Sequence, residues 1–344
     1  MDNSKLLVLV TGGTGFLGSH CIFQLLKQGY RVRTTVRNIA KKETLIQTLE
    51  ESGTKMIEHL SFVEADLNQD KNWKEAAKHA DYILHVASPF PAKMPKDEKV
   101  LLTPAVEGTL RVLKAASEMG VKRVVLTSSF AAIGYSQKAS KEQITEEDWT
   151  DPNNRKISSY TKSKTLAERA AWEFIRANHT DLELSTICPR FILGPSLGNR
   201  FTTSLSVLGD LFNGTMRAFP NVSYGIIDVR DVADLHIRAM TNSNANNQRF
   251  IASSGHPMTF KEIALFLRQE LGQEGKRIST KVYPNWLVRL AALFYPAAKG
   301  VVPNLGKTLI SKNDKAINLL GWNPRSREEA ILASIQSIMK YNRK

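Results

Sequence analysis

A glycine-rich segment near the start of the chain constrains the fold more than any other feature. An apolar run at residues 6–11 leads into GGTGFLG at residues 12–18, and a helical pattern follows at residues 19–28. Glycines between a strand and a helix let the backbone turn sharply and leave its N–H groups free for phosphate oxygens. The positive end of the helix dipole lies at the same place. This order therefore predicts a dinucleotide-binding fold with a pyrophosphate at the turn.

Each glycine of this turn has its own expected role. Gly12 permits the sharp turn, the missing Cβ of Gly15 makes room for the diphosphate, and Gly18 lets the helix pack closely on the strand. A turn that binds no ligand is the alternative, and the strand and helix patterns on either side argue against it. The expected cofactor contacts in this segment are Gly12, Thr14, Gly15, Phe16, Leu17 and Gly18.

Strand-like and helix-like segments alternate through the first half of the chain. Apolar runs lie at residues 31–36, 60–64, 82–86, 123–127 and 184–188, and helical patterns at 100–118 and 159–178. The alternation predicts an α/β fold with a doubly wound parallel sheet, the Rossmann fold. We assign residues 1–190, with about 225–250, to this cofactor-binding domain. Residues 191–224 and 251–344 are expected to form a smaller, mostly helical substrate lobe.

The composition favours an ordinary globular protein over a nucleic-acid-binding one. The 344 residues carry a formal net charge of +14, but Lys and Arg are scattered and form no basic arm. We therefore expect no nucleic-acid partner, and an anionic cofactor or substrate accounts for part of the charge. Cys21 and Cys188 lie in apolar surroundings without metal-ligand spacing, so both are expected to be buried thiols of a cytoplasmic protein.

Two segments bear on export and membrane insertion. The first residues do not resemble a signal peptide. The longest apolar stretch, residues 286–302, is interrupted by charged residues and a proline, so it is too broken to span a bilayer. We expect a protein without a membrane partner.

The end of the second expected strand indicates which nicotinamide cofactor is bound. NAD sites place an acidic residue here, about 20 residues after the glycines, to hold the ribose 2′-hydroxyl. This chain has Arg37 instead, followed by Lys41 and Lys42. A guanidinium binds a 2′-phosphate through two parallel hydrogen bonds, so we predict NADP(H) rather than NAD(H). The alternative is that Arg37 is an ordinary solvated charge.

Further candidate contacts follow the third expected strand. Asp66 and Leu67 stand where a side chain can hold the adenine edge of the cofactor. A turn-forming Asp66 that binds nothing is equally open.

Two segments supply the candidate catalytic groups. Ser129 follows the run at 123–127, at the carboxyl end of a strand, where ligands bind in open α/β sheets. Tyr160 and Lys164 are four residues apart in a helical pattern, so they share one face. An ammonium one turn away lowers the pKa of a phenol, which makes the pair a general acid or base. We predict Ser129, Tyr160 and Lys164 as the catalytic residues.

These motifs, in this order, resemble the extended short-chain dehydrogenases/reductases, and within them the dihydroflavonol 4-reductase-like group. That group includes bacterial aldehyde and ketone reductases, cinnamoyl-CoA reductases and yeast carbonyl reductases. The resemblance spans nearly the whole chain. It is carried by VTGGTGFLGS at 10–19, TVR at 35–37, HVASPF at 85–90, RVVLTSS at 123–129, YTKSKTLAE at 160–168, DVRDVAD at 228–234 and GWNPR at 321–325.

The resemblance implies an NADPH-dependent monomer or homodimer whose catalytic triad is Ser129, Tyr160 and Lys164. It implies that Lys164 hydrogen-bonds the nicotinamide ribose and that the C-terminal lobe selects the substrate. Beyond the glycine turn, the expected cofactor contacts are Arg37, Lys41, Asp66, Leu67, Val86, Ala87, Ser88, Thr127, Tyr160, Lys164 and Pro189.

Two positions depart from the group. Ala105 stands where many short-chain dehydrogenases have a proton-relaying Asn, so no fourth catalytic residue is expected. Gly134 stands where plant dihydroflavonol reductases have the Asn that holds the flavonoid ring, so we expect another substrate.

The predicted reaction is reduction of an aldehyde or ketone to an alcohol by hydride transfer from NADPH, with Tyr160 as proton donor. A sugar-nucleotide epimerase or dehydratase is one alternative, against which Arg37 argues, because those enzymes usually prefer NAD. A non-catalytic NADP-sensing protein is the other, against which the complete Tyr/Lys pair argues. Candidate pocket walls, each equally open to plain core packing, are Phe90, Phe130, Phe191 and Tyr224.

Three acidic residues form the last motif. Asp228, Asp231 and Asp234 look like a metal cluster by composition, but their spacing fits a capped, solvated helix start better. We therefore predict no metal.

Overall fold

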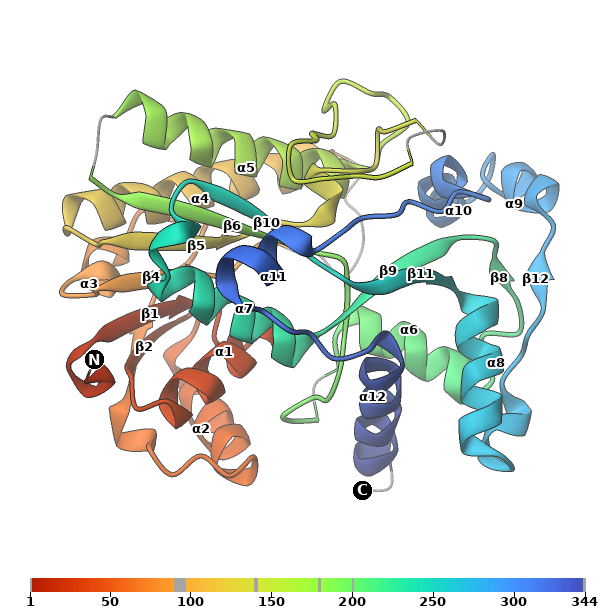
Figure 1. The fold of residues 1–344 in the computed structure, drawn as a ribbon, viewed down its shortest axis with the longest axis horizontal. Coiled ribbons are helices and arrows are strands. Elements are labelled where there is room, and N and C mark those ends of the chain that lie inside the picture. Colours follow the sequence, from red (N-terminus) through yellow and green to blue (C-terminus); the bar gives the residue numbers. More distant parts are fainter. Residues whose placement is uncertain (1, 90–96, 139–141, 179–180, 200, 343–344) are drawn as a thin grey trace.

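Seven parallel strands form the central sheet of this computed structural model (Figure 1). The strand order is β10-β6-β5-β4-β1-β2-β3, and all neighbours pair in parallel. This is the predicted doubly wound Rossmann fold. The structure describes residues 2–89, 97–138, 142–178, 181–199 and 201–342. The strands are β1 (Leu7–Thr11), β2 (Arg31–Val36), β3 (Leu60–Glu64), β4 (Tyr82–His85), β5 (Arg123–Thr127), β6 (Glu183–Pro189) and β10 (Gln248–Ala252).

Helices cover both faces of this sheet. On one face lie α1 (Phe16–Lys27), α2 (Lys42–Glu51) and α7 (Val229–Thr241), and on the other α3 (Trp73–Ala77), α4 (Lys99–Glu118) and α5 (Ser159–Ala177). The position of β1 in the middle of the sheet explains why residues 7–10 are all apolar. Val8 and Val10 enter the core under α1 and α7, whereas Leu9 enters the core under α3 and α4. A strand covered on both faces buries every side chain.

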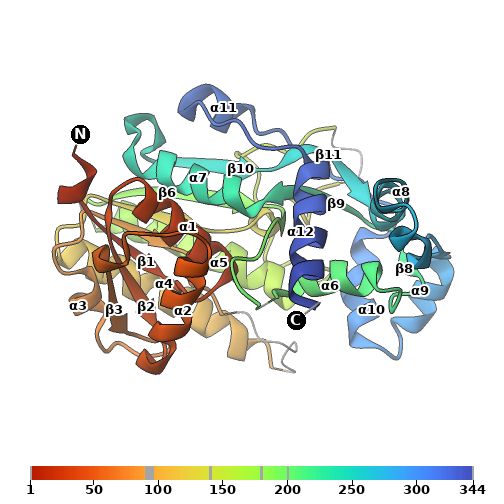
Figure 2. The same cartoon turned by 90° about the horizontal axis from the view of Figure 1, so that it is seen from below.

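A second, smaller sheet lies beside the first and has the order β11-β9-β7. Its strands are β7 (Phe191–Leu193), β9 (Ser223–Asp228) and β11 (Ser254–Thr259), and β8 (Phe219–Pro220) pairs with β12 (Val282–Tyr283). The helices of this half are α6 (Thr203–Phe212), α8 (Phe260–Leu271), α9 (Asn285–Ala291), α10 (Pro296–Val301) and α12 (Arg327–Asn342). Figure 2 shows α12 alongside α6, next to the large-sheet half.

The boundary between the two halves differs in detail from the expected one. Residues 225–228, expected with the large sheet, belong to β9 of the small sheet. Helix α11 (Asp314–Leu320), expected in the C-terminal lobe, packs against α7 and β10 of the large-sheet half. Short 3₁₀ helices lie at Asn3–Lys5, Ile39–Lys41, Ile57–His59, Phe130–Ala132, Ser243–Ala245, Glu274–Arg277 and Val302–Asn304. Within the described ranges, no helix combines the length and apolar character that crossing a bilayer requires.

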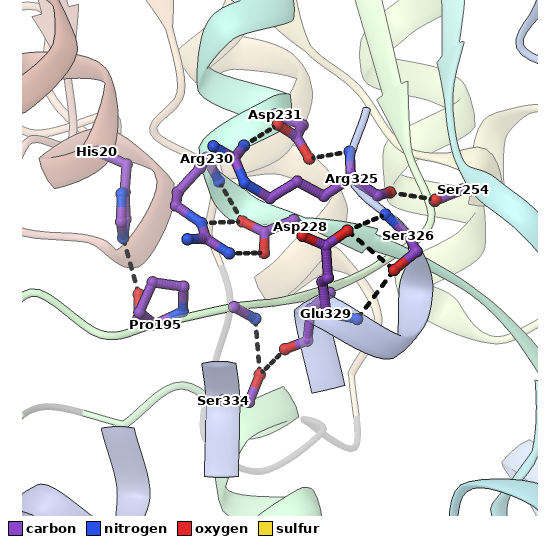
Figure 3. Close-up of polar contacts among 12 residues, drawn as sticks. His20, Pro195, Asp228, Arg230, Asp231, Ser254, Arg325, Ser326, Glu329 and Ser334 are labelled. Atoms are coloured by element: carbon purple, nitrogen blue, oxygen red, sulfur yellow. Dashed lines mark hydrogen bonds and ion pairs between the residues drawn. The ribbon is translucent and has the colours of Figure 1, made fainter. Parts of the chain in front are cut away.

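The start of α7 joins the two halves through acidic side chains (Figure 3). Asp228 caps α7 by accepting the Arg230 backbone N–H at 2.8 Å and forms an ion pair with the Arg230 guanidinium at 2.7 Å. Asp231 accepts the Arg325 backbone N–H at 2.8 Å and pairs with its guanidinium. Asp234 pairs with Arg238 of the same helix. The capped helix start is thus present, but Asp228 and Asp231 are buried rather than solvated.

Candidate active site and cofactor site

The turn between β1 and α1 brings backbone segments so close together that side chains are excluded. Gly12 has φ +71°, in the left-handed region that favours glycine. A Cβ on Gly18 would lie 2.3 Å from the Gly12 carbonyl oxygen, so Gly18 packs against the turn itself rather than the strand. A Cβ on Gly13 would lie 2.1 Å from Thr34 Oγ1. The requirement at Gly13 arises from the neighbouring strand and was missed by the sequence reasoning.

The space beside Gly15 is open. A Cβ there would approach only the Gly12 carbonyl oxygen, at 3.2 Å. This turn borders a cavity of about 210 Å³ that is also lined by Lys41 and by Thr44 and Thr48 of α2. A helix N-terminus facing an open cavity lined by a lysine fits the phosphates of a dinucleotide.

A loop from the second half of the chain lines the other side of this cavity. Ser196, Leu197, Gly198 and Asn199 lie opposite the glycine turn. The loop is held near α1 because His20 hydrogen-bonds the Pro195 carbonyl oxygen at 2.8 Å (Figure 3). These four residues were not among the predicted contacts. The Gly- and Ser-rich composition after residue 193 is the signal that marks a loop here.

Arg37 directly follows β2 and its side chain is exposed. The end of β2 touches the glycine turn, because the Gly12 N–H donates to Thr35 Oγ1 at 3.2 Å. Arg37 therefore stands at the strand end beside the turn, where its guanidinium is accessible to a ligand.

Asp66 is used by its own turn. Its Oδ1 accepts hydrogen bonds from the Asn68 backbone N–H at 2.9 Å and from the Asn68 side chain at 2.8 Å. The turn-forming alternative is therefore present in the structure. Leu67 packs against Gly108, where a Cβ would lie 2.8 Å from the Leu67 Cβ.

A second, narrow cavity joins the ends of β4 and β5 to α5. Leu67, Ala87, Ser88, Thr127 and Lys164 all line it. The segment after β4 is fixed because the Ala87 N–H donates to Thr11 Oγ1 at 3.0 Å. Val86 packs into the adjoining core, and Pro189 ends β6, which pairs with β5. Five of the predicted cofactor contacts thus share one cavity.

The predicted catalytic side chains lie at the same edge of the sheet. The hydroxyls of Ser129 and Tyr160 hydrogen-bond each other, and Ser129 Oγ also accepts the Ala131 N–H at 3.1 Å. Tyr160 lies in the first turn of α5, which Ser158 caps by accepting the Thr161 N–H at 3.1 Å. Lys164, one turn further along, is buried and its Nζ donates to the Thr127 carbonyl oxygen at 3.2 Å.

The pKa of Tyr160 shifts in the direction opposite to the expected one. Burial raises it above its ordinary value, and the hydrogen bond from Ser129 opposes this rise. Burial lowers the pKa of Lys164 to about 8, while Cys188 and Glu168 oppose the decrease. The predicted lowering of the Tyr160 pKa is therefore absent, because desolvation of the phenolate is the larger effect.

A buried ionic network that the sequence reasoning missed lies under Lys164. Glu168, one turn after Lys164, accepts hydrogen bonds from Ser128 at 2.6 Å and from Thr186 at 2.9 Å. Arg249 of β10 pairs with the same carboxylate at 2.7 Å. The signal was present in the motif YTKSKTLAE, where Glu168 falls on the same helix face as Tyr160 and Lys164.

The structure places the predicted pocket-wall residues that it describes in different surroundings. Tyr224 lines a cavity of about 70 Å³ together with Tyr135, and the Phe191 ring lies 5.4 Å from the Tyr224 ring. Phe130 is instead a core residue: it is 1 % exposed and the Arg190 guanidinium covers its ring. Phe90 lies outside the described residues. Gly134 cannot carry a side chain in this arrangement, because a Cβ would lie 2.4 Å from the Phe130 ring.

Comparison with known proteins identifies the family. The model of the NAD dependent epimerase/dehydratase family matches residues 8–252. A cinnamoyl-CoA reductase of Medicago truncatula is 34 % identical over 276 residues, covering 78 % of this chain and 82 % of that protein. An NADPH-dependent methylglyoxal reductase of Saccharomyces cerevisiae is 29 % identical over 367 residues, covering 97 % of this chain and 98 % of that protein.

Solved structures agree with the sequence matches. Gre2 of Candida albicans in complex with NADPH matches with a TM-score of 0.79 at 29 % identity, covering 98 % of this chain and 99 % of that chain. The predicted fold and family are confirmed, and the relatives reported above include an NADPH-dependent reductase and a protein solved with NADPH bound. The chain therefore belongs to the NAD-dependent epimerase/dehydratase family of extended short-chain dehydrogenases/reductases, among its dihydroflavonol 4-reductase-like oxidoreductases.

Proposed function

We propose that this protein is an NADPH-dependent carbonyl reductase that converts an aldehyde or ketone into an alcohol. One observation carries the proposal: the Tyr160 phenol lies within hydrogen-bonding range of Ser129, at the strand edge that borders the second cofactor cavity. The similarity to NADPH-dependent methylglyoxal reductases supports both the cofactor and the reaction. Bound NADPH supplies the hydride.

Residues at or after the ends of β1, β2, β4 and β5 would hold the cofactor. The glycine turn and the loop at 196–199 would hold the phosphates, and Arg37 with Lys41 would bind the 2′-phosphate. Ala87, Ser88 and Thr127 would line the nicotinamide half. In this proposal the large-sheet half binds the cofactor and the small-sheet half selects the substrate.

Ser129 and Tyr160 would act on the carbonyl oxygen. Their hydroxyls already lie within hydrogen-bond reach of each other, so an oxygen placed between them receives two donors. Tyr160 gives its proton to that oxygen as the alcohol forms. Lys164, held by the Thr127 carbonyl, would position the cofactor ribose.

The epimerase alternative is not favoured. Epimerases and dehydratases of this family return the hydride to the substrate, whereas the Saccharomyces cerevisiae relative that covers 97 % of this chain is named an NADPH-dependent methylglyoxal reductase. The exposed Arg37 at the strand end also fits a 2′-phosphate better than a 2′-hydroxyl.

A panel of aldehydes, α-keto esters, aryl ketones and acyl-CoA esters tests the proposal. The purified protein is mixed with each compound and NADPH, and both NADPH loss and alcohol formation are measured. We expect one alcohol per NADPH consumed for at least one class of compound. Turnover of a nucleotide sugar without net NADPH loss, and no reduction across the panel, would instead support the epimerase.

Two finer predictions complete the proposal. Both cysteines are free and buried, which fits a reducing cytoplasmic compartment. A monomer or homodimer remains the predicted assembly.

A further inference from the structure

Arg190 is a cation in the interior of the small-sheet junction. It directly follows Pro189 at the end of β6, and its backbone N–H donates to the Ala252 carbonyl oxygen at 3.0 Å. Its Nη1 donates to the Leu309 carbonyl oxygen at 2.8 Å and to Ser311 Oγ at 3.1 Å. Nε and Nη2 make no hydrogen bond within the described part of the chain. One edge of the guanidinium is therefore anchored and another is available.

The surroundings of Arg190 are shaped around its guanidinium. The Cζ atom lies 3.9 Å from the centre of the Phe130 ring, so the two planar groups are in close contact. Gly225 provides the room on the other side, because a Cβ there would lie 1.9 Å from Arg190 Nε. Replacing Gly225 by any other residue would displace the guanidinium. The position of Arg190 is thus built by its neighbours.

No acidic side chain compensates this charge. Among the described residues, Arg190 takes part in no ion pair, and the only group whose charge acts on it is Tyr135. Burial lowers its pKa to about 10, so it is still a cation at neutral pH. A buried cation without an anionic partner is costly, and Phe130 offsets only part of that cost.

Arg190 lies near the predicted catalytic serine, because its guanidinium covers the ring of Phe130, the residue that directly follows Ser129. The Tyr135 ring packs edge-on against the same Phe130 ring, with the ring centres 5.7 Å apart. Tyr135 and Tyr224 line the 70 Å³ cavity, whose other lining residues include the half-buried Lys307 and no acid. Arg190 donates to the carbonyl oxygen of Leu309, which lines this cavity, so Arg190 and Lys307 place two cations near it.

We propose that Arg190, assisted by Tyr135 and Lys307, binds a carboxylate of the substrate, so that the preferred substrates are small oxo acids. Such a molecule carries a reducible aldehyde or ketone together with a carboxylate. The carboxylate supplies the missing counter-charge through charge-assisted hydrogen bonds to the available edge of the guanidinium. This inference rests on the proposed carbonyl reduction and names its substrate class.

Matched acid and ester pairs test the inference without any variant. The pairs are pyruvate and methyl pyruvate, 4-oxopentanoate and its methyl ester, and 4-carboxybenzaldehyde and methyl 4-formylbenzoate. They keep each carbonyl and vary its distance from the charge. We expect the wild-type protein to favour the acid in at least one pair by about 10- to 100-fold in kcat/KM, as a charge-assisted hydrogen bond supplies.

Substitutions at Arg190 then locate the source of the preference. Arg190→Met should abolish the preference for the acid, because the KM of the acid rises far more than the KM of the ester. Arg190→Lys keeps the charge but not the planar fork, so it should retain part of the preference. Arg289→Met, which removes an exposed arginine of α9, is the matched control and should leave the kinetic constants of both the acid and the ester unchanged.

The outcomes separate the inference from the proposed function. If the wild-type protein reduces every ester as well as its acid, the inference is wrong and the reductase assignment stands. An equal loss for acid and ester in Arg190→Met would show a purely structural role and also overturn it. If neither these compounds nor simple aldehydes are reduced with NADPH, both the proposed function and the inference fall.

Discussion

At the scale of single residues, burial controls the two groups that carry the proposed chemistry. Burial raises the pKa of Tyr160 because its phenolate would be poorly solvated. Burial also lowers the pKa of Lys164 to about 8, because its ammonium would be poorly solvated. The phenol is therefore protonated at neutral pH, as a proton donor must be, although a higher pKa makes it a weaker acid.

The pH dependence of cofactor capture follows from Lys164. Its ammonium is fully present well below pH 8 and is lost as pH rises through its pKa of about 8. Tyr160 stays protonated over this range because its pKa is raised. We therefore expect kcat/KM for NADPH, which reports the free enzyme, to be constant near pH 6–7 and to fall with a midpoint of about 8. A stopped-flow or steady-state profile measures this.

Lys164→Met provides the control for that profile. Its residual kcat/KM for NADPH should be low and independent of pH between about 7 and 9, because the titrating group is gone. A wild-type profile that stays flat up to pH 9 would contradict the assignment of this limb to Lys164.

Arg37 determines the choice between the two nicotinamide cofactors in our account. Arg37→Ala should raise the KM for NADPH by about 10- to 100-fold, because a charge-assisted pair with the 2′-phosphate is lost, and should change the KM for NADH little. Steady-state kinetics with both cofactors measures the ratio. Equal losses for NADPH and NADH would mean that Arg37 does not contact the phosphate.

The sequence was sufficient to predict the residues whose arrangement depends on neighbours a few positions away in the chain. Tyr160 and Lys164 share a helix face because they are four residues apart, and Gly12 marks a turn that only glycine adopts easily. Sequence reasoning left Phe130 open between pocket wall and core, and it missed the requirement at Gly13, because the surroundings of both residues come from distant segments. The Phe130 ring is covered by Arg190, which lies 60 residues away in the chain, and Gly13 meets Thr34 of the next strand.

At the scale of elements, a buried ion pair joins helix α5 to strands β5, β6 and β10. Glu168 is 1 % exposed and accepts from Ser128, Thr186 and Arg249. The carboxylate therefore ties the helix that carries Tyr160 and Lys164 to the strand end that carries Ser129. We infer that this network fixes the distance between the catalytic side chains.

Removing Arg249 leaves the buried carboxylate of Glu168 without its cation. Arg249→Met should lower the free energy of unfolding by about 3–5 kcal/mol, as measured by urea denaturation. Adding Glu168→Gln to this variant removes the orphaned charge and should restore part of the loss. If the double variant is no more stable than Arg249→Met, the penalty does not come from an unpaired charge.

The predicted elements were most accurate where strand and helix alternate. Each of the five predicted apolar runs after β1 became a strand of the central sheet, because a doubly covered strand needs continuous apolar sequence. The small sheet was missed, since β7 has only three residues and the sequences of β9 and β11 are not continuous apolar runs. The pairing of these strands depends on tertiary packing, which local sequence patterns do not predict.

At the scale of the whole molecule, the C-terminal segment fastens the small-sheet half to the large one. Asp231 of α7 holds Arg325 through both its backbone and its guanidinium (Figure 3). The Trp322 indole donates to the Asp231 carbonyl oxygen at 2.9 Å. Helix α12 follows this junction and packs against α6 and β9. The proposed cofactor and substrate surfaces are therefore held together at α7.

Loss of the Asp231 carboxylate should loosen this junction. Asp231→Ala removes two charge-assisted hydrogen bonds at a buried position, so we expect a loss of about 1–3 kcal/mol in the free energy of unfolding and faster tryptic cleavage near Arg325. Asp234→Ala is the matched control, because Asp234 pairs with Arg238 on the partly exposed surface of the same helix. Its loss should be about 0.3–0.5 kcal/mol. Equal effects of both variants would contradict a special role for Asp231.

The central claim is that Tyr160 donates the proton in a reduction driven by NADPH. The direct measurement compares wild-type protein with Tyr160→Phe, using aldehyde turnover and NADPH titration side by side, with the exposed Tyr283→Phe as control. We predict a fall in kcat of at least about 100-fold for Tyr160→Phe, with NADPH affinity within about twofold of wild type. Turnover by Tyr160→Phe at the wild-type rate would contradict the account.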